Sequence, residues 1–173
     1  MRIRPCRERD ISCVKRWITS ERVHDMWCAG RLPYAFQEAL FLEKLKEGEA
    51  EWDQSAFTAV GDDGEPLGFF CISYRREDNS AFMSQIIVNE KERGRGYGRQ
   101  MLELALCYAF TIWHVDAVRL AVFENNAPAR ALYAKVGFHE EEYTPEAFSH
   151  GEEKWGRYIL CARKPQENNI KAL

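Results

Sequence analysis

Alternating glycines mark the part of this sequence best suited to chemistry. The stretch "RGRGYGR", residues 93–99, follows an apolar run at 86–88 and opens a segment with helical spacing. Glycines let the backbone turn sharply and let a ligand reach its N–H groups with no Cβ in the way. These N–H groups precede a helix N-terminus, whose dipole favours an anion, and the arginines could add positive charge. The stretch predicts either a phosphate cradle or a glycine-rich turn with solvated arginines.

Two common phosphate-binding motifs do not fit this stretch. A P-loop requires G-x-x-x-x-G-K-[ST], whereas Arg99 and Gln100 follow the last glycine here. A dinucleotide-binding fold requires G-x-G-x-x-G and an acid at the end of the second strand. The spacing here is G-x-G-x-G, and Asp116 stands at the start of the next strand. Both readings are therefore excluded.

The elements that must hold this loop follow from hydrophobic periodicity and turn residues. Strands are expected at residues 1–6, at two segments of 55–74 around a turn at 62–64, and at 80–88, 117–123, 137–143 and 156–162. Helices are expected at 8–18, at 33–48, from the glycine loop to about residue 113, and from an N-cap at Asn126 to just before Gly137. Pro33 suits the first turn of the second helix and Gly48 its end. The order predicts one mixed α/β domain over residues 1–173.

Composition narrows the class of protein. With 46% apolar and 29% charged residues among 173, the chain is long and apolar enough for one sizeable core. A net charge of −3 gives no electrostatic case for nucleic-acid binding, although it is compatible with a cationic partner. The six cysteines lack C-x-x-C spacing, so reduced thiols are expected and no metal site. We find neither a signal-peptide pattern nor a membrane span, and we expect a cytoplasmic protein without membrane partners.

Two motifs in the right order carry a resemblance to a known family. The first, [Q/R]-x-x-G-x-[G/A], is matched by Arg93, Gly96 and Gly98 after an apolar strand, and "NNAPARALYAKVGF", residues 125–138, follows about 30 residues later. Together with the order of elements, they make the chain resemble the GNAT family, the acyl-CoA-dependent N-acyltransferases, over nearly its whole length. The segment 108–138 looks most like the branch of polyamine and ribosomal-protein N-terminal acetyltransferases. Where many relatives have a proline after the apolar strand, this chain has Glu90.

The resemblance implies a fold and a co-substrate. The fold would be a single-domain α/β GNAT-like acyl-CoA N-acyltransferase fold, with a mixed, mostly antiparallel sheet of six to seven strands flanked by about four helices. Acetyl-CoA would place its pyrophosphate on the backbone N–H groups of the loop without a metal, and its pantetheine arm along residues 86–88. An N–H of Ile87 or Val88 would polarise the thioester carbonyl. The residues implied in cofactor binding are Ile86, Ile87, Val88, Arg93, Gly94, Arg95, Gly96, Tyr97, Gly98, Arg99 and Asn126.

The resemblance also implies the reaction, an acetyl transfer by direct attack of an amine on the thioester. Tyr133 is the family-matched donor of a proton to the leaving thiolate; its alternative role is that of a core aromatic. The base stays open among Glu77, Gln85 acting through water, His114, Glu124 and Glu142. The acceptor is a small amine such as a polyamine, or a peptide or protein amine, and a homodimer is compatible with the resemblance. Aromatic residues that could line the acceptor pocket are Trp27, Tyr34, Phe36, Tyr74, Phe148 and Trp155.

Two other functions stay open at this level. One is a non-catalytic acyl-CoA sensor on the same fold, which turnover of the thioester would distinguish from an enzyme. The other is an unrelated phosphate-binding α/β domain, which titration with acetyl-CoA, ATP and NAD would distinguish.

Overall fold

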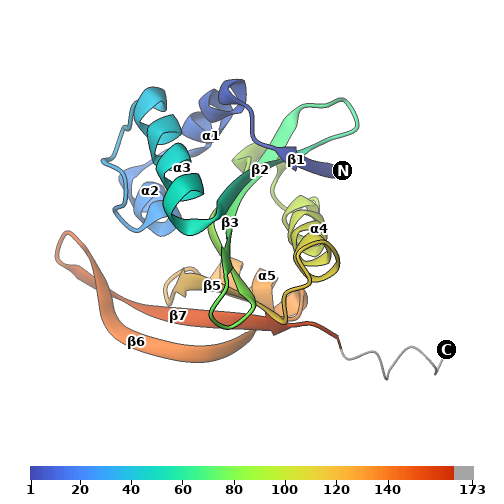
Figure 1. The fold of residues 1–173 in the computed structure, drawn as a ribbon. Coiled ribbons are helices and arrows are strands. Elements are labelled where there is room, and N and C mark those ends of the chain that lie inside the picture. The colour runs from blue at the N-terminus through green and yellow to red at the C-terminus, as the bar shows by residue number, and fades with distance from the viewer. Residues whose placement is uncertain (166–173) are drawn as a thin grey trace.

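A seven-stranded sheet organises residues 1–165, the part of the chain that the computed structural model describes (Figure 1). The strand order is β1-β2-β3-β4-β5-β7-β6, and only the β4–β5 pair is parallel. The strands are β1 (Arg2–Pro5), β2 (Gln54–Val60), β3 (Pro66–Arg75), β4 (Ser80–Val88), β5 (Ala117–Phe123), β6 (His139–His150) and β7 (Glu153–Arg163). The predicted mixed, mostly antiparallel sheet is confirmed.

Helices cover both faces of this sheet. The α-helices of the described residues are α1 (Ile11–Trp17), α2 (Glu21–Cys28), α3 (Glu38–Trp52), α4 (Tyr97–Thr111) and α5 (Ala127–Lys135), with short 3-10 helices at Glu8–Asp10 and Glu90–Glu92. Helices α1 to α3 gather on one face and α4 covers the other (Figure 1). None of these helices is long and apolar enough to cross a membrane.

Strand β3 is buried on both sides because it lies between these two helical layers. Phe69 and Cys71 pack among α1 to α3, whereas Phe70 and Ile72 pack beneath α4. Successive side chains of a strand point to opposite faces, so a continuous apolar run is what a strand between two layers requires. The apolar runs of the sequence thus identify the centre of the fold.

The first half of the chain departs from the sequence prediction. Helix α2 was not expected, and the helix expected at 33–48 is α3, which begins only at Glu38. Pro33 lies in the loop before it. Gly48 lies inside the helix, where it is buried, and α3 continues until Asp53 adopts the left-handed conformation (φ 46°) that ends it. The end signal was wrong because this glycine serves close packing against Gln54.

A buried carboxylate joins β1 to β2 and offers a test of stability. Asp10 is 2% exposed and accepts hydrogen bonds from Arg4 (2.6 and 2.9 Å), the Arg7 N–H (2.8 Å) and the Thr58 hydroxyl (2.9 Å). Burial alone would raise the pKa of Asp10, but these hydrogen bonds outweigh it and hold the pKa below its ordinary value. The stabilisation is therefore present above the unfolded pKa of about 4 and is lost as the pH falls through the folded value.

Replacing this carboxylate should cost stability in a pH-dependent way. We expect Asp10→Asn to lower the free energy of unfolding at pH 7 by about 3 kcal/mol, because it leaves the Arg4 charge without its partner. The difference from wild type should shrink as the pH falls from about 4 toward the lowered pKa of the folded carboxyl, below which the wild-type side chain is also neutral. Urea unfolding across this range measures it. Asp62→Asn, at a side chain 99% exposed, is the matched control and should change little. An equal loss at every pH would contradict the assignment.

Candidate active site

Strands β4 and β5 separate halfway along their length. They pair only between Ser80–Met83 and Ala117–Leu120, while β4 continues beside β3 to its end. The register of β4 against β3 shifts at Gln85, which adopts φ 51°, so that two residues oppose Phe70. Such a bulge bends a strand. The edge of β4 from residue 84 to 88 therefore faces open space where a sheet neighbour would otherwise lie.

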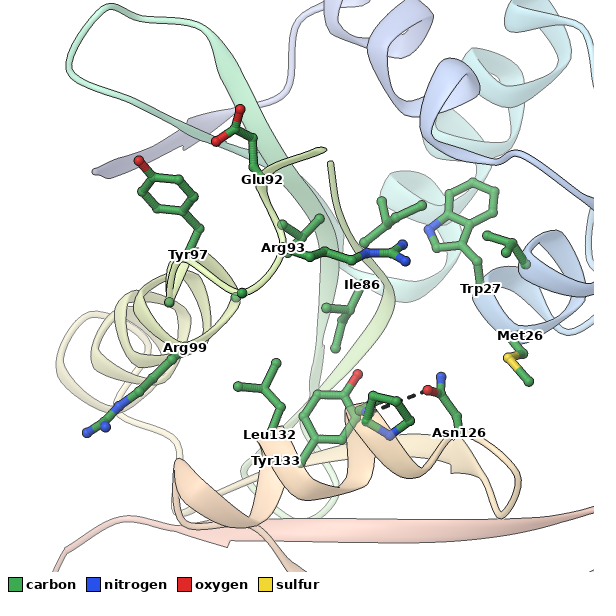
Figure 2. A pocket seen from close by; sticks show the side chains of 18 residues that line it. Met26, Trp27, Ile86, Glu92, Arg93, Tyr97, Arg99, Asn126, Leu132 and Tyr133 are labelled. Carbon is green, nitrogen blue, oxygen red and sulfur yellow. Dashed lines mark hydrogen bonds between the residues drawn. The ribbon is translucent and has the colours of Figure 1, made fainter. Parts of the chain in front are cut away.

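A cavity of about 480 Å³ opens along this free edge (Figure 2). It is lined by Val23, Met26, Trp27, Ile86, Ile87, Val88, Glu92, Arg93, Gly94, Gly96, Tyr97, Gly98, Arg99, Asn126, Pro128, Ala129, Leu132 and Tyr133. Tyr133 and every residue that the sequence predicts for cofactor binding except Arg95 line this cavity. The end of β4, the glycine loop and α5 are thus brought together although they are far apart in the sequence.

The three glycines serve two different purposes. Gly94 and Gly96 have φ of 78° and 83°, a left-handed backbone conformation that residues other than glycine rarely adopt. Space is not the reason for these glycines, because a Cβ at either position would meet no atom within 4 Å. Gly98 is needed for close packing instead, because a Cβ there would lie 3.1 Å from Leu132 of α5. The loop conformation therefore depends on the first two glycines, and the approach of α4 to α5 depends on the third.

The N-terminus of α4 meets the cavity without a capping side chain. Gly96 is its N-cap, and no side chain of the described residues bonds to the first-turn N–H groups. These groups and the helix dipole suit an anion. Among residues 1–165 no cluster of acids, histidines and cysteines that could hold a metal is present. The free backbone N–H groups at the start of α4 therefore suit a phosphate group that binds through hydrogen bonds from amides.

The three loop arginines are not equivalent. Arg93 extends across the cavity toward Trp27, whereas Arg99 extends away from it (Figure 2). Arg99 pairs with Glu103 at 2.7 Å. Arg95 does not line the cavity, and its side chain pairs with Glu92 at 2.8 Å, so its contact with a ligand stays a prediction.

The register of β4 decides which of its N–H groups is free. Asn89 N–H donates to the Leu67 carbonyl at 2.9 Å, and hydrogen-bonded and free pairs alternate along an antiparallel ladder. Ile87 and Phe69 therefore form the next bonded pair, and the N–H of Val88 points toward the open edge. Of the two amides expected from the sequence, the one at Val88 is available to a ligand.

Helix α5 carries the two remaining predicted residues. Asn126 caps it, its side-chain oxygen accepting from the Ala129 N–H at 3.4 Å, as the sequence predicts. Tyr133 is 7% exposed and packs against Phe138, and its hydroxyl points into the cavity toward Ile86 (Figure 2). Burial raises the pKa of Tyr133 above its ordinary 10.0. The phenol therefore holds its proton at neutral pH and is a donor rather than a base.

None of the five base candidates lines this cavity. Glu124 is held by the Tyr143 hydroxyl (2.6 Å) and the Gly156 N–H (2.8 Å), which lower its pKa and make it a weaker base. Glu142, on exposed β6, accepts from the Thr144 hydroxyl at 3.4 Å. The structure does not bring Glu77 or His114 to the cavity, and Gln85 lines a smaller neighbouring one.

Sequence reasoning named Trp27 as an acceptor-pocket candidate but missed α2, the helix that carries it, and its neighbour Met26. Trp27 donates its indole N–H to the Gln85 carbonyl at 2.8 Å, which fixes α2 on the bulge of β4. Met26 and Trp27 line both the large cavity and a second one of about 90 Å³. A signal was present, because Ser20 is a good N-cap and residues 23, 26 and 27 have helical spacing.

Of the aromatic residues expected around an acceptor, only Trp27 lines either of these two cavities. Phe36 packs in the core of α1 to α3, and Phe148 and Trp155 pack on Phe123 at 5.2 and 5.3 Å between ring centroids. Of the two remaining aromatic residues, Tyr34 is exposed and Tyr74 packs on Trp113.

A mostly antiparallel sheet that opens between two parallel strands, with an anion cradle beside the opening, defines an acyl-CoA N-acyltransferase fold. The family model described as "Acetyltransferase (GNAT) family" matches residues 21–138. The chain therefore belongs to the GNAT family, and the predicted resemblance is confirmed. It is an N-acetyltransferase with acetyl-CoA as its co-substrate.

Several known proteins are similar to it. A spermidine N(1)-acetyltransferase from Vibrio cholerae is 38% identical over 64 residues, 37% of each chain. An N-alpha-acetyltransferase from Sulfurisphaera tokodaii is 29% identical over 143 residues, covering 76% of this chain and 80% of that protein. The crystal structure of a spermidine N-acetyltransferase from Vibrio cholerae in complex with CoA and spermine has a TM-score of 0.80 at 21% identity, covering 93% of this chain and 94% of that one.

Proposed function

We propose that this chain acetylates the primary amine of a small molecule by direct attack of the amine on the acetyl-CoA thioester. One observation carries the proposal: the open β4 edge, the uncapped N-terminus of α4 and the Tyr133 hydroxyl all face one cavity. The named activities of the relatives support an amine acceptor, since they include spermidine and N-alpha acetylation.

Different parts of this cavity bind acetyl-CoA and activate its thioester. In the proposal, the N–H groups of the glycine loop and of the first turn of α4 hold the pyrophosphate, with Arg93 adding charge. The Val88 N–H donates to the thioester carbonyl and stabilises the negative charge that develops there. The Asn126 side chain holds the start of α5 and contacts the pantetheine arm.

Protons must move in two directions during this reaction. An alkylamine with a pKa near 10.4 is neutral in only about one molecule in a few thousand at pH 7, so the attacking amine must lose a proton. The leaving thiolate must gain one, and the protonated Tyr133 is positioned to supply it. Among residues 1–165, the only carboxylate that lines the large cavity is Glu92, which pairs with Arg95 at 2.8 Å, so we assign no side chain as the base.

Thiol release tests this function against the sensor alternative. Purified protein with acetyl-CoA should release CoA thiol only when an amine acceptor is present. The panel should contain amino acids, polyamines, aminoglycosides and N-terminal peptides. Tight acetyl-CoA binding without thiol release from any acceptor would support a sensor instead.

The proposal also covers the cellular location, the domain extent and the assembly of the enzyme. We place it in the cytoplasm as a single N-acetyltransferase domain over residues 1–173, acting without nucleic acid or membrane, with a homodimer as the assembly to be tested. The net charge of −3 and the unpaired cysteines support this setting. Light scattering of the purified protein measures the assembly.

A further inference from the structure

The small second cavity lies at the mouth of the opening between β4 and β5. It is lined by Met26, Trp27, Cys28, Ala29, Arg31, Phe82, Met83, Ser84, Gln85, Ala121, Val122, Phe123 and Arg157. Met26 and Trp27 also line the large cavity, so the two adjoin. An acceptor in the small cavity would approach the thioester from the side opposite the cradle. Its volume of about 90 Å³ is some three times the ~30 Å³ that a liquid water occupies, which suits a small group.

The charged residues of this cavity are both arginines. Arg31 follows α2, and Arg157 lies on β7 opposite Phe123. Arg157 is two residues after Trp155, which packs under Arg22 of α2 at 5.0 Å, so its side chain lies on the face of the sheet that α2 covers. Both cations therefore reach the acceptor side of the opening.

Neither arginine has a counter-ion within residues 1–165. The ion pairs of this part of the chain use other arginines. The Nε of Arg157 is buried and makes no hydrogen bond, an arrangement that costs free energy unless a ligand supplies the acceptor atom.

The same cavity offers nothing to a polycation. Within the described part of the chain, residues 1–165, no acidic residue lines it. Helix α2 carries two acids: Asp25 is held by His150 at 2.8 Å and His24 at 3.2 Å, and Glu21 is exposed in the first turn. A polyamine carries several ammonium groups at neutral pH, and two unpaired guanidinium groups would repel them. An acceptor with its own negative charge would meet two partners of opposite sign, as charge complementarity requires.

We propose that the acceptor is a small primary amine that also carries an anionic group, a carboxylate or a phosphonate, which Arg157 and Arg31 bind while the amine faces the thioester. This inference rests on the proposed function and specifies its acceptor. The guanidinium groups offer paired N–H donors that match either oxyanion. The amine nitrogen forms a bond to the acetyl carbon, and the bond from that carbon to the CoA sulfur breaks. The sulfur leaves with its electron pair and takes a proton from Tyr133, and the proton that the nitrogen releases restores the one that Tyr133 gave.

Matched acceptors test the proposal. Thiol release is measured with L-alanine against L-alaninamide, aminomethylphosphonate against ethylamine, and spermidine as the polycation. We expect kcat/KM at least tenfold higher for each anionic amine than for its neutral partner, and lowest for spermidine. The carboxylate and phosphonate arms distinguish which oxyanion fits better. Equal or better turnover of the neutral amines or of spermidine would overturn the proposal.

Arginine variants test whether a preference for anionic acceptors depends on this cavity. Arg157→Gln should raise KM for the anionic acceptor about tenfold and remove the preference, with acetyl-CoA affinity and turnover of the neutral amine unchanged. Arg163→Gln is the matched control, because it lies on the same strand and face but is 73% exposed. A preference that survives Arg157→Gln overturns the assignment. If acetyl-CoA binds but no anionic amine is acetylated, the anionic acceptor is wrong; if acetyl-CoA does not bind, the proposed function itself fails.

Discussion

Tyr133→Phe is expected to lower kcat by 10²- to 10³-fold, or about 3–4 kcal/mol of barrier, while acetyl-CoA binding stays nearly unchanged. The variant removes one hydroxyl and keeps the ring, which packs against Phe138 at 5.9 Å between centroids. The fold should therefore survive. Because burial raises the pKa of Tyr133 above 10.0, the phenol stays protonated throughout the neutral range. We expect no alkaline loss of kcat from this group below about pH 10.

The measurement is steady-state thiol release with separate titration of acetyl-CoA. A loss shared equally between kcat and kcat/KM would indicate an interaction made only in the transition state. Tyr108→Phe is the matched control, because Tyr108, on α4, packs against the same core cluster that contains Tyr133 but lines neither cavity. If Tyr133→Phe retains more than about half of the wild-type kcat, the residue serves packing and the proton comes from elsewhere.

The sequence predicts those parts of the site that depend on local structure. The glycine loop needs left-handed residues directly before a helix, and Asn126 caps α5 from one position, so both features are visible as short patterns. The pairing of Arg95 and Arg99 with acids three and four residues away was also readable from spacing.

The remaining features depend on contacts between distant segments. Helix α2 has only eight residues, too few to be stable alone, and it is fixed by the bond from Trp27 to Gln85. The left-handed conformation of Gln85 is imposed by pairing with β3, because a glutamine gives no sign of it. Arg31 and Arg157 belong to opposite ends of the chain, so no spacing rule predicts that they line one cavity.

Gly96→Val is expected to weaken acetyl-CoA binding at least tenfold, about 1.4 kcal/mol, with the fold largely intact. Two effects act together. Valine is branched at Cβ and disfavours the φ of 83° that the glycine adopts, so the loop would shift. If the loop holds instead, the side chain occupies the space beside the α4 N-terminus where the phosphate is proposed to lie.

Gly64→Val separates these effects from general strain. Gly64 lies in the turn between β2 and β3 with φ 85°, and a Cβ at this position, like one at Gly96, would meet no atom within 4 Å. Both variants should therefore lose similar stability in urea unfolding, since the backbone penalty is the same. Only Gly96→Val should lose acetyl-CoA affinity in isothermal titration.

A well-folded Gly96→Val protein with unchanged affinity would show that the loop does not bind the pyrophosphate. Equal losses of affinity in both variants would attribute the effect to strain, because Gly64 lies outside both cavities.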